Sequence, residues 1–372
     1  MVWFVLLSNR WEHVWFHLKV LVQHIINTET KMAVKLNIKN GVVDLAMGAG
    51  GKAMHHLIEQ MIKKSFDSQY LAQAEDQAIL PQINGKIAMT TDSYVITPYF
   101  FRGGNIGSLA IHGTVNDLVV GGAKPLYISV GLILEEGLPL RDLKVILDSM
   151  AETAKKANVQ IVTGDTKVVE KGKGDGIFIN TTGVGVIRDD FVTRDTLEDG
   201  DEIIINGTLG DHGVAVMSQR AGLDFECQIV SDATSLDSLV DAIYDNKCQI
   251  KTMRDPTRGG VGATLNEWAN QYNVAIEIDE ANLPISTEVQ SACELLGLDP
   301  LYIANEGKVL IACKPSQTQK VLDCLRGHPL GENAQVIATV RKSEQSQVFM
   351  KTTFGGKRRV DWLSGEQLPR IC

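Results

Sequence analysis

The sequence lacks the cysteine patterns of a zinc site or a disulfide framework. Its six cysteines lie at positions 227, 248, 293, 313, 324 and 372, and none forms a C-x-x-C pair. The first five have the apolar or ordinary helix and strand contexts of buried, inert thiols. The sixth, Cys372, is the last residue of the chain, where a core position is not expected.

The chain also lacks a basic cluster and a long hydrophobic run. Its formal net charge is −9 and its pI is about 5.4, so nucleic acid and an anionic membrane are not expected as partners. The apolar run Val2–Leu7 is too short to cross a bilayer, and Arg10 follows it without a signal-peptide layout. Residues 1–35 are predicted to be an N-terminal extension, disordered or helical, with Met32 as the expected working start, and the protein is expected in the cytoplasm.

Strand-like and helix-like segments alternate from about residue 36 onward, which favours two mixed α/β domains. The predicted boundaries are 36–192 for the first domain and 193–354 for the second. After Phe354 no apolar period survives, and residues 355–372 are predicted to be a mobile tail. The patterns predict helices over Lys52–Phe66, Gly107–Val120 and Leu138–Ala157, and strands over Lys86–Ile96, Leu126–Leu134 and Ile177–Ile187.

A glycine turn precedes the first predicted helix. It contains Gly48, Gly50, Gly51 and Lys52, and its backbone amides could turn toward a phosphate at the helix N-terminus. It does not have the spacing of a Walker A loop. A simple turn is the alternative interpretation.

Acidic residues recur at strand ends and in polar loops. Asp92 interrupts a strand of Thr, Val and Ile, and Asn116 and Asp117 close the run HGTVND. A carboxylate in such a strand is costly unless it is paired or bound to a metal, and Mg²⁺ prefers oxygen ligands. Asp76 and Asp255 share this polar setting. The alternative is that Asp76, Asp165 and Asp211 are ordinary turn or cap residues.

Three further loops contain charged residues. Asp165, Thr166 and Lys167 lie in TGDTK, which is interpreted as a segment just beyond a strand end, and Glu306 lies in NEGK before another strand. Such positions often hold catalytic groups, but from spacing alone solvated surface charge is the favoured interpretation. The loop 254–260 (RDPTRGG) could hold a phosphate or pair its charges internally.

Taken in order, these motifs resemble one family. The matching segments are MGAGGKAM, TTDSYVITP, HGTVNDLVVGGAKP, GDTKVV, GDHG, DPTRGG, NEGK and the terminal PRIC. They are similar to the HypE family of hydrogenase maturation proteins, which are carbamoyl dehydratases within the wider group of aminoimidazole ribonucleotide synthetase-like ATP enzymes. The likeness runs from Leu36 to Cys372, and the terminal cysteine is its specific part. Two departures are Met47, where the family has histidine, and the leading segment.

The resemblance implies a fold and an assembly. Two mixed α/β domains of the synthetase-like type are expected, and the N-terminal domains of two chains would pair into a dimeric β-barrel. A homodimer that binds ATP and Mg²⁺ is therefore expected. The carbamoyltransferase HypF and the HypC–HypD iron scaffold would be its partners.

The resemblance also implies a reaction: ATP-dependent dehydration of a carbamoyl group on the Cys372 sulfur to a thiocyanate, which supplies cyanide to the iron of [NiFe]-hydrogenase. Lys167 and Glu306 would take part in proton transfer, with their division of labour open. Arg370 could offset the effect of the terminal carboxylate on the thiol. The implied nucleotide contacts are Gly48, Gly50, Gly51, Lys52, Asn116, Asp165 and Thr166, and the implied metal ligands are Asp76, Asp92, Asp117 and Asp255.

Three alternatives compete with this interpretation. A selenophosphate synthetase would have a reactive cysteine near the glycine turn, and no cysteine precedes position 227. A synthetase that acts on a free metabolite would not need Cys372. A nucleotide-binding scaffold without turnover would not need Lys167 and Glu306.

Overall fold

The computed structural model describes residues 35–73, 75–188, 195–220, 229–363 and 370–372. Contacts divide the chain into two units, Met1–Asn37 and Ile38–Cys372. Nearly all of the first unit, including residues 1–34 of the predicted extension, lies outside the described residues. Among the described residues, no helix is both long enough and apolar enough to cross a bilayer.

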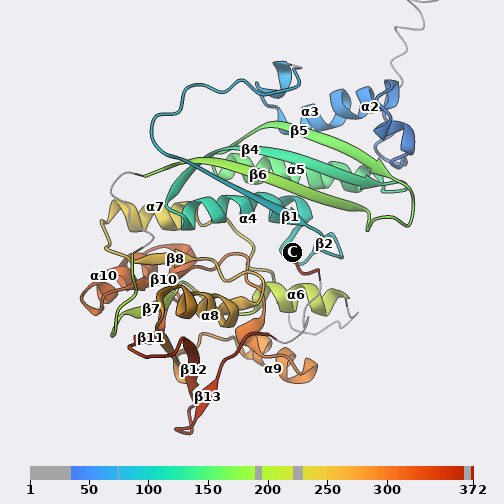
Figure 1. Ribbon diagram of the computed structural model, residues 1–372. Helices are drawn as coiled ribbons and strands as arrows, with labels where there is room; N and C mark the ends of the chain where they lie inside the picture. The colour runs from blue at the N-terminus through green and yellow to red at the C-terminus, as the bar shows by residue number, and fades with distance from the viewer. Residues whose placement is uncertain (1–34, 74, 189–194, 221–228, 364–369) are drawn as a thin grey trace, which may run out of the picture. The chain divides into compact units, whose positions relative to one another are not determined.

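Within the described chain, the first sheet has four strands in the order β1-β6-β4-β5. They are β1 (Ile87–Tyr94), β4 (Ala123–Glu135), β5 (Gln160–Val169) and β6 (Ile177–Ile187). β4 and β5 run parallel, and the other two pairs are antiparallel. A parallel pair needs a crossover, which is supplied by α5 (Leu140–Lys156). The helices α4 (Ile106–Val120) and α5 pack side by side, α4 against β1, β6 and β4, and α5 against β5 (Figure 1).

Nearly all of α4 is buried, so the helix has no amphipathic pattern. Its N-terminus is fixed by a capping box between Asn105 and Ser108. Of its 15 residues, only His112 and Asp117 are not fully buried. Both can ionise, and both face segments of the second half of the chain.

The segment before β1 is largely helical. It contains η1 (Leu45–Gly48), α2 (Lys52–Leu57), the π turn η2 (Ile58–Ile62), α3 (Lys63–Phe66) and η3 (Leu71–Gln73). α2, η2 and α3 follow one another without a break, which confirms the predicted helix over 52–66 and adds a π turn within it. A two-stranded hairpin, β2 (Phe100–Phe101) and β3 (Gly104–Asn105), precedes α4.

The second sheet has seven strands in the described part of the chain, in the order β13-β12-β9-β11-β7-β10-β8. The strand β7 lies between β11 and β10, and its three isoleucines are fully buried. The strands are β7 (Glu202–Ile205), β8 (Thr252–Arg254), β9 (Ala275–Asp279), β10 (Leu310–Cys313), β11 (Gln335–Arg341), β12 (Gln347–Lys351) and β13 (Lys357–Arg359).

The helices of this half are α6 (Asp211–Arg220), α7 (Asp237–Asp245), α8 (Gly260–Tyr272), α9 (Thr287–Leu296) and α10 (Pro315–Arg326). Three short 3₁₀ turns join them, η4 (Glu280–Asn282), η5 (Pro300–Tyr302) and η6 (Pro329–Gly331). α8 belongs to the core of this sheet, where Trp268 is 1% exposed and packs with Ile203, Ile276 and Leu310.

Two expectations about local structure were wrong. Lys357–Arg359 form β13 and pair with β12, so the sheet continues beyond the predicted end at Phe354. Lys167 lies inside β5, not beyond a strand end. In both segments the polar side chains belong to strands at the edge of a sheet, where one side of the backbone pairs and the side chains remain solvated.

Candidate active site

Three carboxylates that the sequence analysis assigned to a metal lie close enough to influence one another. Asp92 is on β1, Asp117 is on α4, and Asp255 follows β8. Burial, and then the charge of Asp117, raise the pKa of Asp255 to about 7. The pKa of Asp117 is also raised, mainly by burial and further by Asp92, although a 2.7 Å hydrogen bond from Thr90 Oγ1 opposes this. The two sheets therefore meet at a cluster of carboxylates.

Glu306 is the most deeply buried member of this cluster. It lies in the loop before β10 and is 3% exposed. Burial raises its pKa well above the ordinary value, and the charges of Asp232 and Asp255 add to the effect. Within the described structure, its Oε1 atom is buried without a hydrogen-bond partner. A carboxylate of this kind is uncharged over much of the pH range and becomes a strong base once it ionises.

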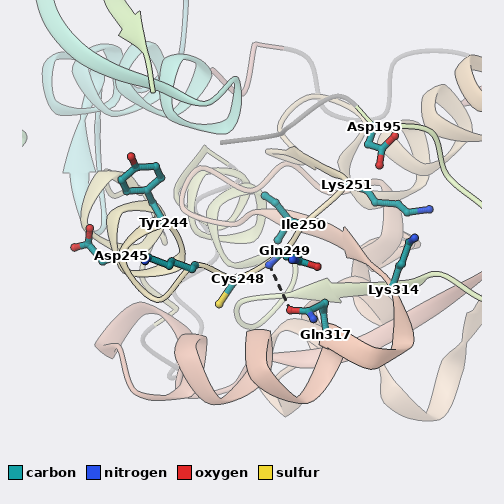
Figure 2. Close-up of a pocket in the computed structure, with 10 residues that line it drawn as sticks. Asp195, Tyr244, Asp245, Cys248, Gln249, Ile250, Lys251, Lys314 and Gln317 are labelled. Carbon is teal, nitrogen blue, oxygen red and sulfur yellow. Dashed lines mark hydrogen bonds between the residues drawn. The ribbon is translucent and has the colours of Figure 1, made fainter. Parts of the chain in front are cut away.

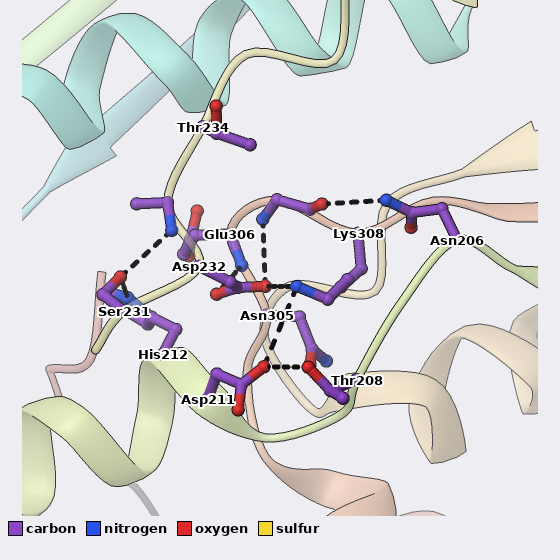
Figure 3. A network of polar contacts seen from close by, with 12 residues as sticks. Asn206, Thr208, Asp211, His212, Ser231, Asp232, Thr234, Asn305, Glu306 and Lys308 are labelled. Atoms are coloured by element: carbon purple, nitrogen blue, oxygen red, sulfur yellow. Dashed lines mark hydrogen bonds and ion pairs between the residues drawn. The ribbon is translucent and has the colours of Figure 1, made fainter. Parts of the chain in front are cut away.

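Asp232 fixes the backbone that carries Glu306. Its Oδ1 accepts a hydrogen bond from the Glu306 amide at 3.1 Å, and its Oδ2 accepts one from the Gly307 amide at 3.3 Å. The Lys308 ammonium donates to Asp232 Oδ2 at 2.8 Å and lies 3.9 Å from Asp211 Oδ2 (Figure 3). Burial would raise the pKa of Asp232, but the charge of Lys308 and its hydrogen bond help to outweigh this, and the pKa of Asp232 is lowered.

Gly307 allows this loop to press against the segment that contains Asp232. A Cβ atom at Gly307 would lie 2.0 Å from the Asp232 carbonyl oxygen. Any side chain here would push the Glu306 loop away from Asp232.

Asn116 joins the same loop to α4. Its Nδ2 donates to the Thr234 carbonyl at 3.0 Å and to the Glu306 carbonyl at 3.3 Å, while its Oδ1 accepts from the Leu236 amide at 2.8 Å. Asn116 is 1% exposed. Both ends of its amide bond to the backbone of the second half of the chain, so Asn116 holds the Glu306 loop against α4.

The C-terminal thiol lies at this cluster. The Val95 amide donates to the main-chain oxygen of Cys372 at 3.0 Å, and Ile371 is 3% exposed. Burial, and next the charge of Glu306, raise the pKa of the Cys372 thiol to about 12, although Arg258 opposes the shift. The terminal cysteine and the buried glutamate are therefore neighbours.

Arg370 does not have the predicted effect on the thiol. Its guanidinium forms an ion pair with Asp175 and donates to the Val95 carbonyl at 3.3 Å. The cation that lowers the pKa of Cys372 is Arg258, in the loop that follows β8.

The glycine turn packs against β5. A Cβ atom at Gly48 would lie 2.8 Å from Val168 Cβ, and Gly50 has a φ of +76°, so both positions require glycine. A Cβ atom at Gly50 or Gly51 would meet nothing within 4 Å. Space is therefore open above the turn, and Lys52 begins α2 there.

Lys167 and Asp165 lie apart from the buried carboxylates. Both are exposed, on the face of β5 opposite to that of the buried Thr166, and Lys167 Nζ lies 2.7 Å from Asp165 Oδ2. The pKa of Asp165 is lowered, first by its hydrogen bond with Lys167. Within one chain, the structure therefore does not bring Lys167 to Glu306 and Cys372.

Asp76 also stays outside the cluster. It is exposed in the segment between η3 and β1 and is not among the main charges that shift the pKa values of Asp117, Asp255 or Glu306. Among the residues described, no group of three or more His, Cys, Asp or Glu side chains is arranged to hold a metal ion. Among these residues, the predicted metal ligands therefore do not form a complete coordination site.

The sequence analysis missed two residues of the site, Asp232 and His212. Asp232 follows Ser231, directly after the apolar pair Ile229 and Val230, without any motif around it. His212 is part of the GDHG segment, where only the aspartate drew attention. A buried histidine and a buried aspartate cannot be told from surface ones by residue type alone.

A separate cavity of about 740 Å³ lies in the second half of the chain. Figure 2 shows that Tyr244, Cys248, Lys251 and Lys314 line it. Lys251 is 4% exposed and is paired with Asp201 at 2.7 Å and Glu198 at 2.8 Å. None of the predicted site residues lines this cavity.

Comparisons with known proteins agree with this geometry. Residues 74–187 match the N-terminal domain of the AIR synthase related proteins, and residues 198–351 match their C-terminal domain. Carbamoyl dehydratase HypE of Azotobacter vinelandii is 50% identical over 339 residues, which are 91% of this chain and 99% of the relative. The chain belongs to the HypE family.

Solved HypE structures share its fold. A HypE crystal structure in complex with ATP is 44% identical, has a TM-score of 0.84, and matches over 88% of this chain and 99% of its own. A chain of the HypE–HypF complex is 45% identical, with a TM-score of 0.71, and matches over 82% of this chain and 99% of its own. The predicted family and the mixed α/β synthetase-type fold are confirmed.

Proposed function

We propose that this HypE-family protein dehydrates a carbamoyl group on its own Cys372 to a thiocyanate at the expense of ATP. The observation that carries the proposal is the position of the last residue: the Cys372 thiol lies beside the buried Glu306 carboxyl, and the charge of Glu306 acts on its pKa. A chain that acts on a free metabolite has no need to hold its own terminus in its carboxylate cluster.

The dehydration has two steps, phosphorylation of the carbamoyl oxygen and loss of phosphate. The carboxamide oxygen of the S-carbamoyl group attacks the γ-phosphorus of ATP, so that an O–P bond forms and ADP leaves. The C–O bond then breaks and releases phosphate, while two N–H protons are lost and the C≡N triple bond forms. The products are Cys372–S–C≡N, ADP, phosphate and one net proton. Phosphorylation is needed because oxide is a poor leaving group, whereas phosphate is a good one.

Glu306 is the group best placed to take an N–H proton. Its raised pKa makes its carboxylate a stronger base than an exposed glutamate. The Glu306 amide donates a hydrogen bond to Asp232, and the Glu306 carbonyl accepts one from Asn116, so the loop is held in place while the proton moves. Lys167 would act in the same reaction only from a second copy or after a rearrangement, because in one chain it lies on the other side of the sheet.

The cluster fits a hard divalent cation. Asp92, Asp117 and Asp255 supply oxygen donors, and the mutual repulsion that helps to raise the pKa values of Asp117 and Asp255 would be relieved by a positive ion. These three side chains would hold Mg²⁺ together with phosphate oxygens and water, with Asp76 as a further predicted ligand. Mg²⁺ would neutralise charge on the phosphates. Gly48, Gly50, Gly51 and Lys52 would contact those phosphates.

The proposal includes partners. HypF would supply the carbamoyl group, which is supported by the solved HypE–HypF complex of a relative, and the HypC–HypD scaffold would receive cyanide for the hydrogenase iron. We also propose a homodimer through the open face of the first sheet, where Ile87, Met89 and Ile133 are 61%, 71% and 43% exposed. Large apolar side chains that share one exposed sheet face are typical of an interface.

Intact-protein mass spectrometry tests the reaction. The wild type and Cys372→Ala would each be incubated with active HypF and carbamoyl phosphate, with and without Mg-ATP. We expect a carbamoyl adduct on the wild-type C-terminal peptide that loses the mass of one water when ATP is present, and no adduct on Cys372→Ala. An unmodified wild-type tail in a mixture where HypF is demonstrably active would refute the proposal.

A further inference from the structure

The last three residues of the chain are each held through a main-chain oxygen. Arg220 Nη2 donates to the Arg370 carbonyl at 2.8 Å, and His212 Nε2 lies 2.8 Å from the Ile371 carbonyl oxygen. The Val95 amide donates to the main-chain oxygen of Cys372 at 3.0 Å. His212 and Arg220 both belong to α6, beside which the C-terminus ends in Figure 1.

His212 is built to serve as a fixed donor. The ring is fully buried, and its other nitrogen, Nδ1, lies 2.8 Å from Ser231 Oγ (Figure 3). Because a carbonyl oxygen can only accept, Nε2 carries the hydrogen, and Nδ1 accepts from the serine hydroxyl. Burial lowers the pKa of His212, which keeps the ring in this neutral form. Phe101 packs edge-on against it at 5.5 Å between ring centres.

Arg220 is held equally firmly. Its Nε and Nη2 atoms donate to the Thr97 carbonyl at 2.9 and 2.7 Å. Thr97 is two residues after Val95, so the guanidinium ties α6 to the same segment whose amide binds Cys372. The three groups that donate to the C-terminal residues therefore lie on α6 and on the Val95–Thr97 segment, which Arg220 joins.

We propose that α6 and the segment after β1 form a receptor for the C-terminal tripeptide, with His212 and Arg220 as positioning residues that hold Cys372 against Glu306. This inference rests on the proposed function. The receptor binds the main-chain oxygens of the tripeptide and the buried side chain of Ile371. Its three hydrogen-bond donors do not contact the thiol. It therefore accepts the free, carbamoylated and cyanated forms of the same terminus.

The test measures how readily Cys372 is alkylated in the full-length protein. Docking buries the thiol and raises its pKa to about 12, so the docked form reacts slowly with iodoacetamide. His212→Asn keeps a polar group near Nδ1 for Ser231 but cannot reach Ile371, whereas the amide nitrogen of His212→Gln can occupy the position of Nε2. We expect alkylation to be about 5- to 10-fold faster in His212→Asn, as the loss of one hydrogen bond implies, and close to wild type in His212→Gln.

Buried Cys313 serves as an internal control, because its alkylation in the same digest reports unfolding. A second variant, Ile371→Gly, is used if His212→Asn exposes Cys313. It weakens docking by removing the buried side chain of the tail, and we expect it to accelerate alkylation of Cys372 to the same extent. Equal rates in wild type, His212→Asn and Ile371→Gly, with Cys313 protected in all three, would overturn the inference. The assay needs neither ATP nor HypF, so its outcome is independent of whether the dehydration is found.

Discussion

The ionisation of His112 should make the stability of this protein depend on pH in a way that one substitution removes. His112 is on α4, and its Nδ1 lies 2.8 Å from Ser235 Oγ. Burial, assisted by the charge of Lys156, lowers its pKa from 6.5 to about 4. Ser235 is in the segment that follows Asp232, so this contact lies between α4 and the residues that fix the Glu306 loop.

The direction of the effect follows from proton linkage. The folded protein binds a proton at His112 more weakly than the unfolded chain does, so lowering the pH favours unfolding. The contribution of neutral His112 to the free energy of unfolding is fully present above pH 6.5 and is lost as the pH falls toward 4. Between pH 7.5 and pH 5, a change in pKa from 6.5 to about 4 corresponds to a loss of about 2 kcal/mol in the free energy of unfolding.

His112→Asn isolates this contribution. The shorter amide can keep the contact with Ser235 but cannot take up a proton. Urea unfolding would be followed at pH 7.5 and pH 5 for the wild type, His112→Asn and a control, His55→Asn, in which an exposed histidine of α2 is replaced. We expect the wild type and the control to lose about 2 kcal/mol more than His112→Asn over this interval.

Other groups also make the stability depend on pH. Burial raises the pKa of Asp255 to about 7, so its protonation stabilises the folded protein as the pH falls, opposite to the effect of His112. These contributions are common to all the variants and cancel when the variants are compared. The reasoning is refuted if His112→Asn and the wild type show the same change in the free energy of unfolding between the two pH values.

Three further predictions concern the loop that carries Glu306. Glu306→Gln should accept the carbamoyl group and then stall, so that mass spectrometry of the C-terminal peptide shows the adduct without loss of water; formation of thiocyanate at the normal rate would remove Glu306 from the proton transfer. Gly307→Ala should lower the free energy of unfolding by roughly 1–3 kcal/mol, because its Cβ would lie 2.0 Å from the Asp232 carbonyl oxygen; an unchanged urea midpoint would contradict this clash. Asn116→Asp keeps the shape of the side chain and the hydrogen bond from the Leu236 amide but loses two donated hydrogen bonds. We therefore expect the free energy of unfolding, measured with urea, to fall by roughly 2–4 kcal/mol. A decrease below about 1 kcal/mol would show that these hydrogen bonds are not needed.

Regular elements were predictable because their patterns are local. The alternation in Lys86–Ile96 and the amphipathic period in Leu138–Ala157 correspond to β1 and α5. The helix predicted over Gly107–Val120 corresponds to α4 (Ile106–Val120), although a helix buried on nearly all sides has no polar face. β13 is three residues long and wholly exposed, and nothing in its composition separates it from a tail.

The site was predictable by residue type but not by role. The sequence places Asn116 and Asp117 side by side, and only the fold shows that the amide of one is used by the backbone of the second half while the carboxylate of the other joins the cluster. Lys167 and Thr166 are likewise neighbours, but strand alternation sends them to opposite faces of β5. Roles of this kind depend on contacts between residues more than 100 positions apart.

The docked terminus also constrains when the thiol can be loaded. With a pKa of about 12 in place of 9, the docked thiol at neutral pH has about a thousandfold smaller thiolate fraction than a free one, and the thiolate is the nucleophile. We infer that the thiol receives its carbamoyl group while the tail is undocked, and that the loaded terminus then docks in the receptor. The same burial then becomes an advantage, because after loading the sulfur has no proton to lose and the carboxamide lies beside Glu306, away from water. The chain thus separates the step that needs an exposed nucleophile from the step that needs a dry site, with one residue serving both.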